Sequence, residues 1–154
     1  MKYLQINHPL DLPYENDLNG VRTKDPKVQA ALNQMVDIAC MGATPAKLQR
    51  DLAHYISDPN DLFEIGYVFG FLDAHKTFIW KVSEFNRSFF HIGFRSYFEN
   101  WELTNIGLLN AVTAISGNDT EFMHAVQIGK VDALRLLEEG AHPNGLRMHF
   151  RTKN

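Results

Sequence analysis

Hydrophobic and polar positions in residues 25–57 repeat with the spacing of two helices. Apolar side chains recur every three or four residues after Pro26, and they do so again after Thr44 and Pro45, on either side of Gly42. Proline at the first helical position is a start signal, and glycine is a stop signal. The pattern therefore predicts a helical hairpin over residues 25–57.

Aromatic residues are concentrated in the middle of the chain. Thirteen of the 18 aromatic residues fall between Phe63 and Trp101, many of them at helical spacing. Rings buried in one helical core would supply much of the driving force for folding. The pattern predicts aromatic-rich central helices over residues 58–118, with an exposed aromatic binding surface as the alternative. Gly66 and Gly70 have the spacing that allows two helices to pack closely.

Two shorter helical patterns follow in the stretch TEFMHAVQIGKVDALRLLEEGAHPNG, from Thr120 to Gly145. Gly129 separates the two patterns, and Gly140 ends the second with a residue that accepts a left-handed backbone. Two helices this short cannot bury their apolar faces alone. The stretch predicts a pair of short helices that packs on a larger helical body.

This stretch, within residues 119–145, resembles one ankyrin repeat. It has that family's threonine and alanine in the first helix, the glycine between helices, the Leu-Leu pair and the Gly-Ala-x-Pro-Asn ending. It departs from the family at Glu121, where proline is usual, and at Met123, where histidine is usual. The resemblance implies structural roles: a helix cap for Thr120, close helix contact for Ala125 and Gly129, core packing for Leu136 and Leu137, and a loop-fixing role for Asn144.

The resemblance also implies a function, which is to bind another protein as an inhibitor, an adaptor or an immunity-type factor. Little chain follows Gly140 to cover the second helix, so its outer face and the tail are the expected contact with a partner or a second copy. The tail could instead fold back as a cap. The expected protein-binding residues are Lys130, Asp132, Arg135, His142, Asn144, Arg147, Met148, Phe150 and Arg151.

DNA binding is the alternative function. The segment MGATPAKLQRDL resembles the turn and the recognition-helix start of a helix-turn-helix domain, which would use residues 44–54. Asp37 stands where that family has an apolar residue, so nucleic acid is the less favoured partner. The residues expected to face the major groove are Thr44, Lys47, Gln49 and Arg50.

Composition narrows the remaining possibilities. The net charge of −3 gives no overall attraction to nucleic acid or anionic membranes. Cys40 is the only cysteine, which fits a reducing, cytoplasmic location. No apolar run approaches the ~20 residues that span a bilayer. The sequence has no metal-ligand spacing, phosphate loop or nucleophile motif, so we expect no cofactor, no metal and no enzymatic activity.

Together these patterns predict an all-α fold. Residues 25–154 are expected to form one compact multi-helix domain that ends in the ankyrin-like helix pair. Residues 1–24 contain Pro9, Pro13 and Gly20, which are typical of loops. We expect them to form an N-terminal arm, with a short strand at its start.

Overall fold

The structure is a computed structural model that describes residues 26–153. This part of the chain contains six helices and no strand, so the all-α prediction is confirmed. The N-terminal arm predicted over residues 1–24 lies outside the described residues. The helices are α2 (Pro26–Leu52), α3 (Leu62–Trp80), α4 (Arg87–Phe98), α5 (Trp101–Ser116), α6 (Thr120–Glu139) and α7 (Gly145–Thr152).

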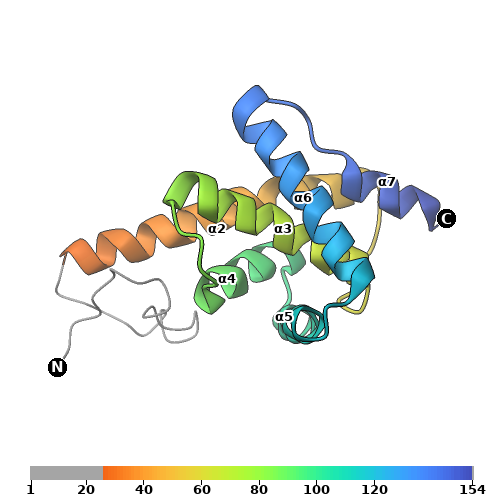
Figure 1. The fold of residues 1–154 in the computed structure, drawn as a ribbon, viewed down its shortest axis with the longest axis horizontal. Coiled ribbons are helices and arrows are strands. Elements are labelled where there is room, and N and C mark those ends of the chain that lie inside the picture. Colours follow the sequence, from red (N-terminus) through yellow and green to blue (C-terminus); the bar gives the residue numbers. More distant parts are fainter. Residues whose placement is uncertain (1–25, 154) are drawn as a thin grey trace.

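Helix α3 is the centre of the molecule (Figure 1). It contacts each of the other five described helices. Asp61 caps its N-terminus, and the Asp61 side chain accepts hydrogen bonds from the backbone N–H groups of Phe63 and Glu64. Every residue from Ile65 to Leu72 is buried. A helix covered on all sides has to be apolar all round, which explains the density of rings in this segment.

The predicted aromatic core is confirmed for most of its rings. Phe69 and Phe90 stack within it, with ring centroids 4.2 Å apart. Phe78, Phe85 and Trp101 are 37, 39 and 45% exposed, so the prediction is wrong for these three. They lie near helix ends or in a connection, where fewer neighbours can cover a side chain. The buried rings are Tyr67, Phe69, Phe71, Phe89, Phe90, Phe94, Tyr97 and Phe98.

Helix α2 corrects the predicted hairpin. It runs without a break through Gly42 and Pro45. Gly42 is buried against α3, where a Cβ would lie 3.1 Å from Leu72 and 3.2 Å from His75. The Thr44 hydroxyl donates to the Cys40 carbonyl at 2.8 Å. The glycine therefore serves helix packing, and tertiary contacts outweigh the local signals for a turn.

The crossing of α3 and α6 explains three glycines at once. A Cβ on Gly66 would lie 2.6 Å from the Phe122 carbonyl oxygen, and one on Gly70 would lie 2.1 Å from that of Val126. From the other helix, a Cβ on Gly129 would lie 2.2 Å from the Tyr67 carbonyl oxygen. The two backbones are thus in direct contact, which confirms the predicted role of Gly66 and Gly70.

Helix α6 corrects the predicted pair of short helices. It is one helix of 20 residues from Thr120 to Glu139, and Gly129 lies inside it rather than at a turn. Close approach to α3 is the reason for this glycine. The prediction for the C-terminal end of α6 is confirmed, because Gly140 has φ +69° and caps the helix in the left-handed conformation.

The tail folds back on the body as helix α7, which confirms the cap that the sequence left open. Leu146 and Phe150 are fully buried. The Asp61 carboxylate, itself buried, pairs with His149 at 2.9 Å and with Lys153 at 2.6 Å. These ion pairs fasten α7 to the start of α3. Phe150, which the sequence suggested as a partner contact, is therefore a core residue and not part of the exposed surface.

A chain of buried hydrogen bonds fixes the start of α7. The Gln49 side-chain oxygen accepts from the backbone N–H groups of Leu146 and Arg147 at 3.0 and 3.1 Å. The Gln49 amide donates to the Tyr67 hydroxyl at 2.8 Å. That hydroxyl donates in turn to Asp132 at 2.7 Å. Side chains of α2, α3 and α6 thus converge on α7.

Candidate functional site: an apolar ridge on α5 and two hollows

Helix α5 presents most of its large apolar side chains to solvent. It lies at the edge of the molecule, seen nearly end-on in Figure 1. Its buried residues are small: Thr104, Gly107, Ala111 and Ala114. An amphipathic helix normally has the opposite arrangement, with its large apolar residues facing the core. We call the exposed set the α5 ridge: Trp101, Ile106, Leu109, Val112 and Ile115, which are 45, 41, 66, 39 and 36% exposed.

Close packing explains why the inner face of α5 is small. A Cβ on Gly107 would lie 2.8 Å from the ring of Phe98, at the end of α4. Ala111 is fully buried. The Asn110 side chain donates to the Pro59 carbonyl at 2.8 Å and so ties α5 to the segment before α3. With little room inside, only Leu103 and Leu108 of the large apolar residues pack partly against the core, and the others remain on the outer face of α5.

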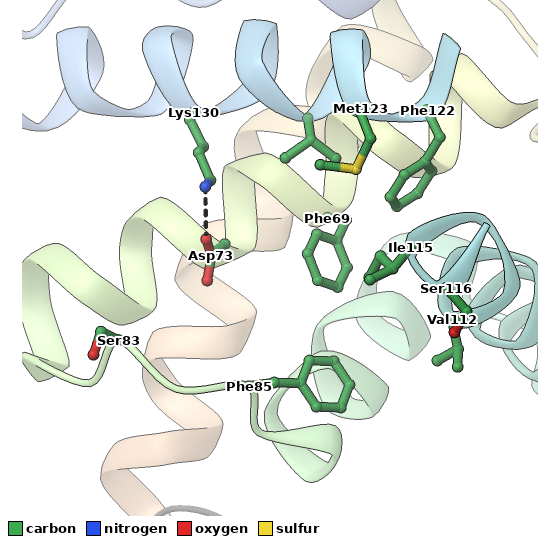
Figure 2. A pocket seen from close by; sticks show the side chains of 11 residues that line it. Phe69, Asp73, Ser83, Phe85, Val112, Ile115, Ser116, Phe122, Met123 and Lys130 are labelled. Carbon is green, nitrogen blue, oxygen red and sulfur yellow. Dashed lines mark ion pairs between the residues drawn. The ribbon is translucent and has the colours of Figure 1, made fainter. Parts of the chain in front are cut away.

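One side of the ridge borders a hollow of about 380 Å³, the first hollow (Figure 2). Its walls come from α3, α5, α6 and the connection between α3 and α4. The volume lies within the range of small-molecule sites. The residues that line it are Phe69, Asp73, Ser83, Phe85, Val112, Ile115, Ser116, Phe122, Met123, Val126 and Lys130.

Charged groups gather at one end of the first hollow. Asp73 pairs with Lys130 across α3 and α6 at 3.2 Å, as the dashed line in Figure 2 shows. Asp73 also pairs with Lys76 at 3.4 Å. Lys76 is fully buried and donates to the carbonyls of Val82 and Glu84 at 2.8 and 2.7 Å. Burial lowers the pKa of the Lys76 ammonium. These two hydrogen bonds fix the connection between α3 and α4, which forms the floor of the hollow.

The other side of the ridge borders a second hollow of about 440 Å³. Val112 lines both hollows, so the ridge runs between them. The guanidinium of Arg95 lies 5.5 Å from the ring centroid of Trp101, beside this hollow. The residues that line the second hollow are Arg87, His91, Trp101, Asn105, Leu108, Leu109 and Val112.

The residues predicted to bind DNA do not form one exposed face. Gln49 and Arg50 are buried. Arg50 donates to the Tyr97 carbonyl, and its guanidinium lies 4.8 Å from the Tyr97 ring centroid. Lys47 pairs with Glu99. Because α2 is continuous, the turn that precedes a recognition helix is also missing, so the predicted helix-turn-helix arrangement is not formed.

The residues predicted to bind protein divide into two groups. Asp132 and Lys130 are engaged within the molecule, Asp132 by Tyr67 and the Gly145 N–H, and Lys130 by Asp73. Phe150, as described above, is buried. Six members of the set are at least partly exposed, and four of them lie on α7 or at its N-cap, whereas Arg135 lies on α6 and His142 in the connection between the two helices: Arg135, His142, Asn144, Arg147, Met148 and Arg151.

Sequence reasoning missed the α5 ridge, although a signal was present. Glu102 is the only charged residue in the 16 residues of α5. Small residues recur at three- and four-residue intervals from Thr104 to Ala114. Such a stripe marks the face of close contact, which leaves the large apolar residues on the opposite face.

A buried acidic side chain, Glu64, lies in the core rather than in either hollow. It is fully buried and accepts from the Tyr97 hydroxyl and, at 2.9 Å, from the Asp58 N–H. Burial raises the pKa of this carboxyl to about 7, against the hydrogen bond from Tyr97, which acts to lower it. No described contact places it against solvent, so its role is structural.

Glu64→Gln should change how stability depends on pH. The pKa of Glu64 rises from 4.5 unfolded to about 7 folded, so the folded chain binds the proton more tightly. The stability gained from this tighter proton binding is fully present below pH 4.5 and is lost as the pH rises through 7. The free energy of unfolding of Glu64→Gln, relative to wild type, should therefore rise by roughly 3 kcal/mol from pH 4 to 8. Urea titrations across this range measure it.

The matched control for this prediction is Glu138→Gln, which alters an exposed glutamate of α6. Burial lowers the pKa of His75, so the stability that its neutral form contributes is lost as the pH falls below 6.5. This pH trend is opposite to that of Glu64. That effect is common to wild type and both variants, so it cancels in the difference. Parallel curves for wild type and Glu64→Gln would contradict the prediction.

The described residues contain no group of three His, Cys, Asp or Glu side chains that could hold a metal ion. Within the same part of the chain, no helix is long and apolar enough to cross a bilayer. No family model, curated protein or solved structure matches this chain. The α5 ridge and the two hollows are therefore the features from which a function can be inferred.

Proposed function

We propose that this protein acts by binding another protein through the α5 ridge, without catalysis, as an inhibitor, an adaptor or an immunity-type factor. The supporting observation is the inverted polarity of α5, with small residues inside and five large apolar residues outside. A single exposed apolar residue is ordinary in a folded protein. Five exposed large apolar residues on one helix, next to two hollows, are typical of an interaction site.

The free energy of burying apolar side chains favours the same surface. Burying one large aliphatic side chain contributes about 1.5–3 kcal/mol. Leu109 is 66% exposed and lines the second hollow. Most of its side chain therefore remains to be buried by a partner. Contact energy in protein interfaces is concentrated in a few central apolar or aromatic residues. Leu109, Val112 and Trp101 are the candidates for that centre.

The surface expected from the sequence, on α6, is the alternative location. Val131 and Leu134 are 52 and 36% exposed there. They are fewer than the ridge residues, and neither lines the first or the second hollow. The two locations make different predictions for a cross-linking experiment.

A photoreactive amino acid placed at Leu109 should form covalent adducts with a partner in extracts of the native host. The same residue at Val131 should give no such adduct, and at Glu138 it serves as the exposed control. Gel electrophoresis and mass spectrometry identify the products. Adducts at Val131 alone would move the site to α6. Adducts of twice the chain mass at Leu109 would identify the partner as a second copy of this chain. Absence of adducts at both positions would contradict the proposal.

A further inference from the structure

The first hollow has features of a small-molecule site that are independent of the proposed protein-binding function. We propose that it binds a small amphipathic carboxylate, which has an apolar chain and one anionic group. The chain lies among the aromatic and aliphatic side chains, and the carboxylate accepts hydrogen bonds from Lys130. The ridge faces outward from α5, whereas this hollow lies between α5 and α6, with only Val112 and Ile115 common to both.

The walls of the first hollow suit an apolar chain. Phe69 and Phe85 form part of one wall, and both stack on Phe90, with centroids 4.2 and 5.3 Å apart. Stacked rings hold each other in place and present a firm surface to a ligand. Met123 lies on the opposite side in Figure 2 and is 36% exposed. Its unbranched thioether can adapt to chains of different shape.

The charge at the polar end favours an anion. One carboxylate, Asp73, is shared by two ammonium groups, those of Lys76 and Lys130. The Glu84 carboxylate also acts on Lys76, so the two ammonium groups and the two carboxylates balance one another. A ligand carboxylate placed beside Lys130 would gain an ionic contact with its ammonium, whereas a ligand ammonium in the same place would be repelled by it.

The two lysines differ in what they can offer a ligand. Lys76 is buried and its three donors already have acceptors, at Val82, Glu84 and Asp73. Lys130 lines the hollow, and its side chain is 36% exposed. Its ammonium has three donors and uses Asp73 as one acceptor. Lys130 is therefore the group that can bind the ligand, and Ser83, at the same end in Figure 2, adds a hydroxyl.

Sodium octanoate is the probe, and the methionine methyl groups are the reporters. In protein labelled with ¹³C at the methionine methyls, octanoate should shift the Met123 signal in a saturable way. Met41 and Met148 are exposed, at 49 and 56%, but lie outside the hollow, so their signals should stay in place. Octylammonium should bind more weakly than octanoate. Equal shifts at all three methionines, no shift at Met123, or equal binding of the two ions would overturn the proposal.

Two variants test the assignment of groups. Lys130→Met removes the charge and keeps an apolar stem, so it should weaken octanoate binding about five- to tenfold and leave the binding of 1-octanol unchanged. Arg135→Met, on the exposed face of the same helix, is the control and should bind octanoate as wild type does. Ser116→Phe adds a ring to the wall and should weaken both ligands. Unchanged octanoate affinity in Lys130→Met would remove Lys130 from the site.

Discussion

Gly129→Ala should lower the free energy of unfolding by about 3 kcal/mol or more. The added Cβ would lie 2.2 Å from the Tyr67 carbonyl oxygen, and backbone atoms of a buried helix cannot move aside as a flexible side chain can. Alanine is otherwise favoured over glycine inside a helix by up to about 1 kcal/mol. The expected loss is therefore a net value after that gain. Urea unfolding followed by far-ultraviolet circular dichroism measures it.

Gly117→Ala is the matched control for this prediction. A Cβ at Gly117 would lie 3.4 Å from the Thr113 carbonyl oxygen, which is an ordinary contact. This variant should remain within about 1 kcal/mol of wild type. If Gly129→Ala were equally mild, α3 and α6 would not be in backbone contact at this crossing. A turn at Gly129, as first expected from the sequence, would then become the better explanation of this glycine.

Phe89→Ala should cost about 3–5 kcal/mol. Phe89 is fully buried on α4, and its ring packs edge-on against Phe90, with centroids 5.5 Å apart. Removing the ring leaves a cavity in a core made largely of other rings, which cannot collapse to fill it. Phe78→Ala is the control. Phe78 is 37% exposed near the end of α3, so this variant should lose far less free energy of unfolding. Equal losses for the two variants would show that burial does not determine the cost.

The features that were predictable from sequence are those that depend on local chemistry or on composition. The helical periodicity and the density of rings indicated an all-α fold with an aromatic core. Gly140 was identified correctly because a left-handed helix cap depends on the conformation of one residue. Gly66 and Gly70 were also interpreted correctly, because their spacing puts both on one helix face.

The errors have a common physical cause. Gly42 and Gly129 were interpreted as turns, since a glycine between two helical patterns fits either a turn or a close helix contact. Only the neighbouring helix decides, and at both positions a residue far away in sequence occupies the space that a side chain would need. The same ambiguity produced the expected helix-turn-helix around Thr44 and the expected helix pair around Gly129.

The candidate site was harder to predict than the fold. The α5 ridge requires knowing which face of an almost uncharged helix is covered, and that depends on how closely α4 approaches Gly107. The first hollow combines residues from three helices and a connection. Lys130 was chosen from the sequence for a different reason, as part of an exposed face on α6. Its position beside Asp73 appears only when α3 and α6 have crossed.

The anchoring of α7 sets an order of events during folding. Gln49 and Leu146, which form one of its hydrogen bonds, are 97 residues apart. Asp61 and Asp132 supply further anchors from the start of α3 and from α6. A contact between such distant residues gains nothing until the chain between them is organised, because closing the loop costs entropy first. The hydrogen bonds that anchor α7 therefore become favourable only where α2, α3 and α6 are already close together.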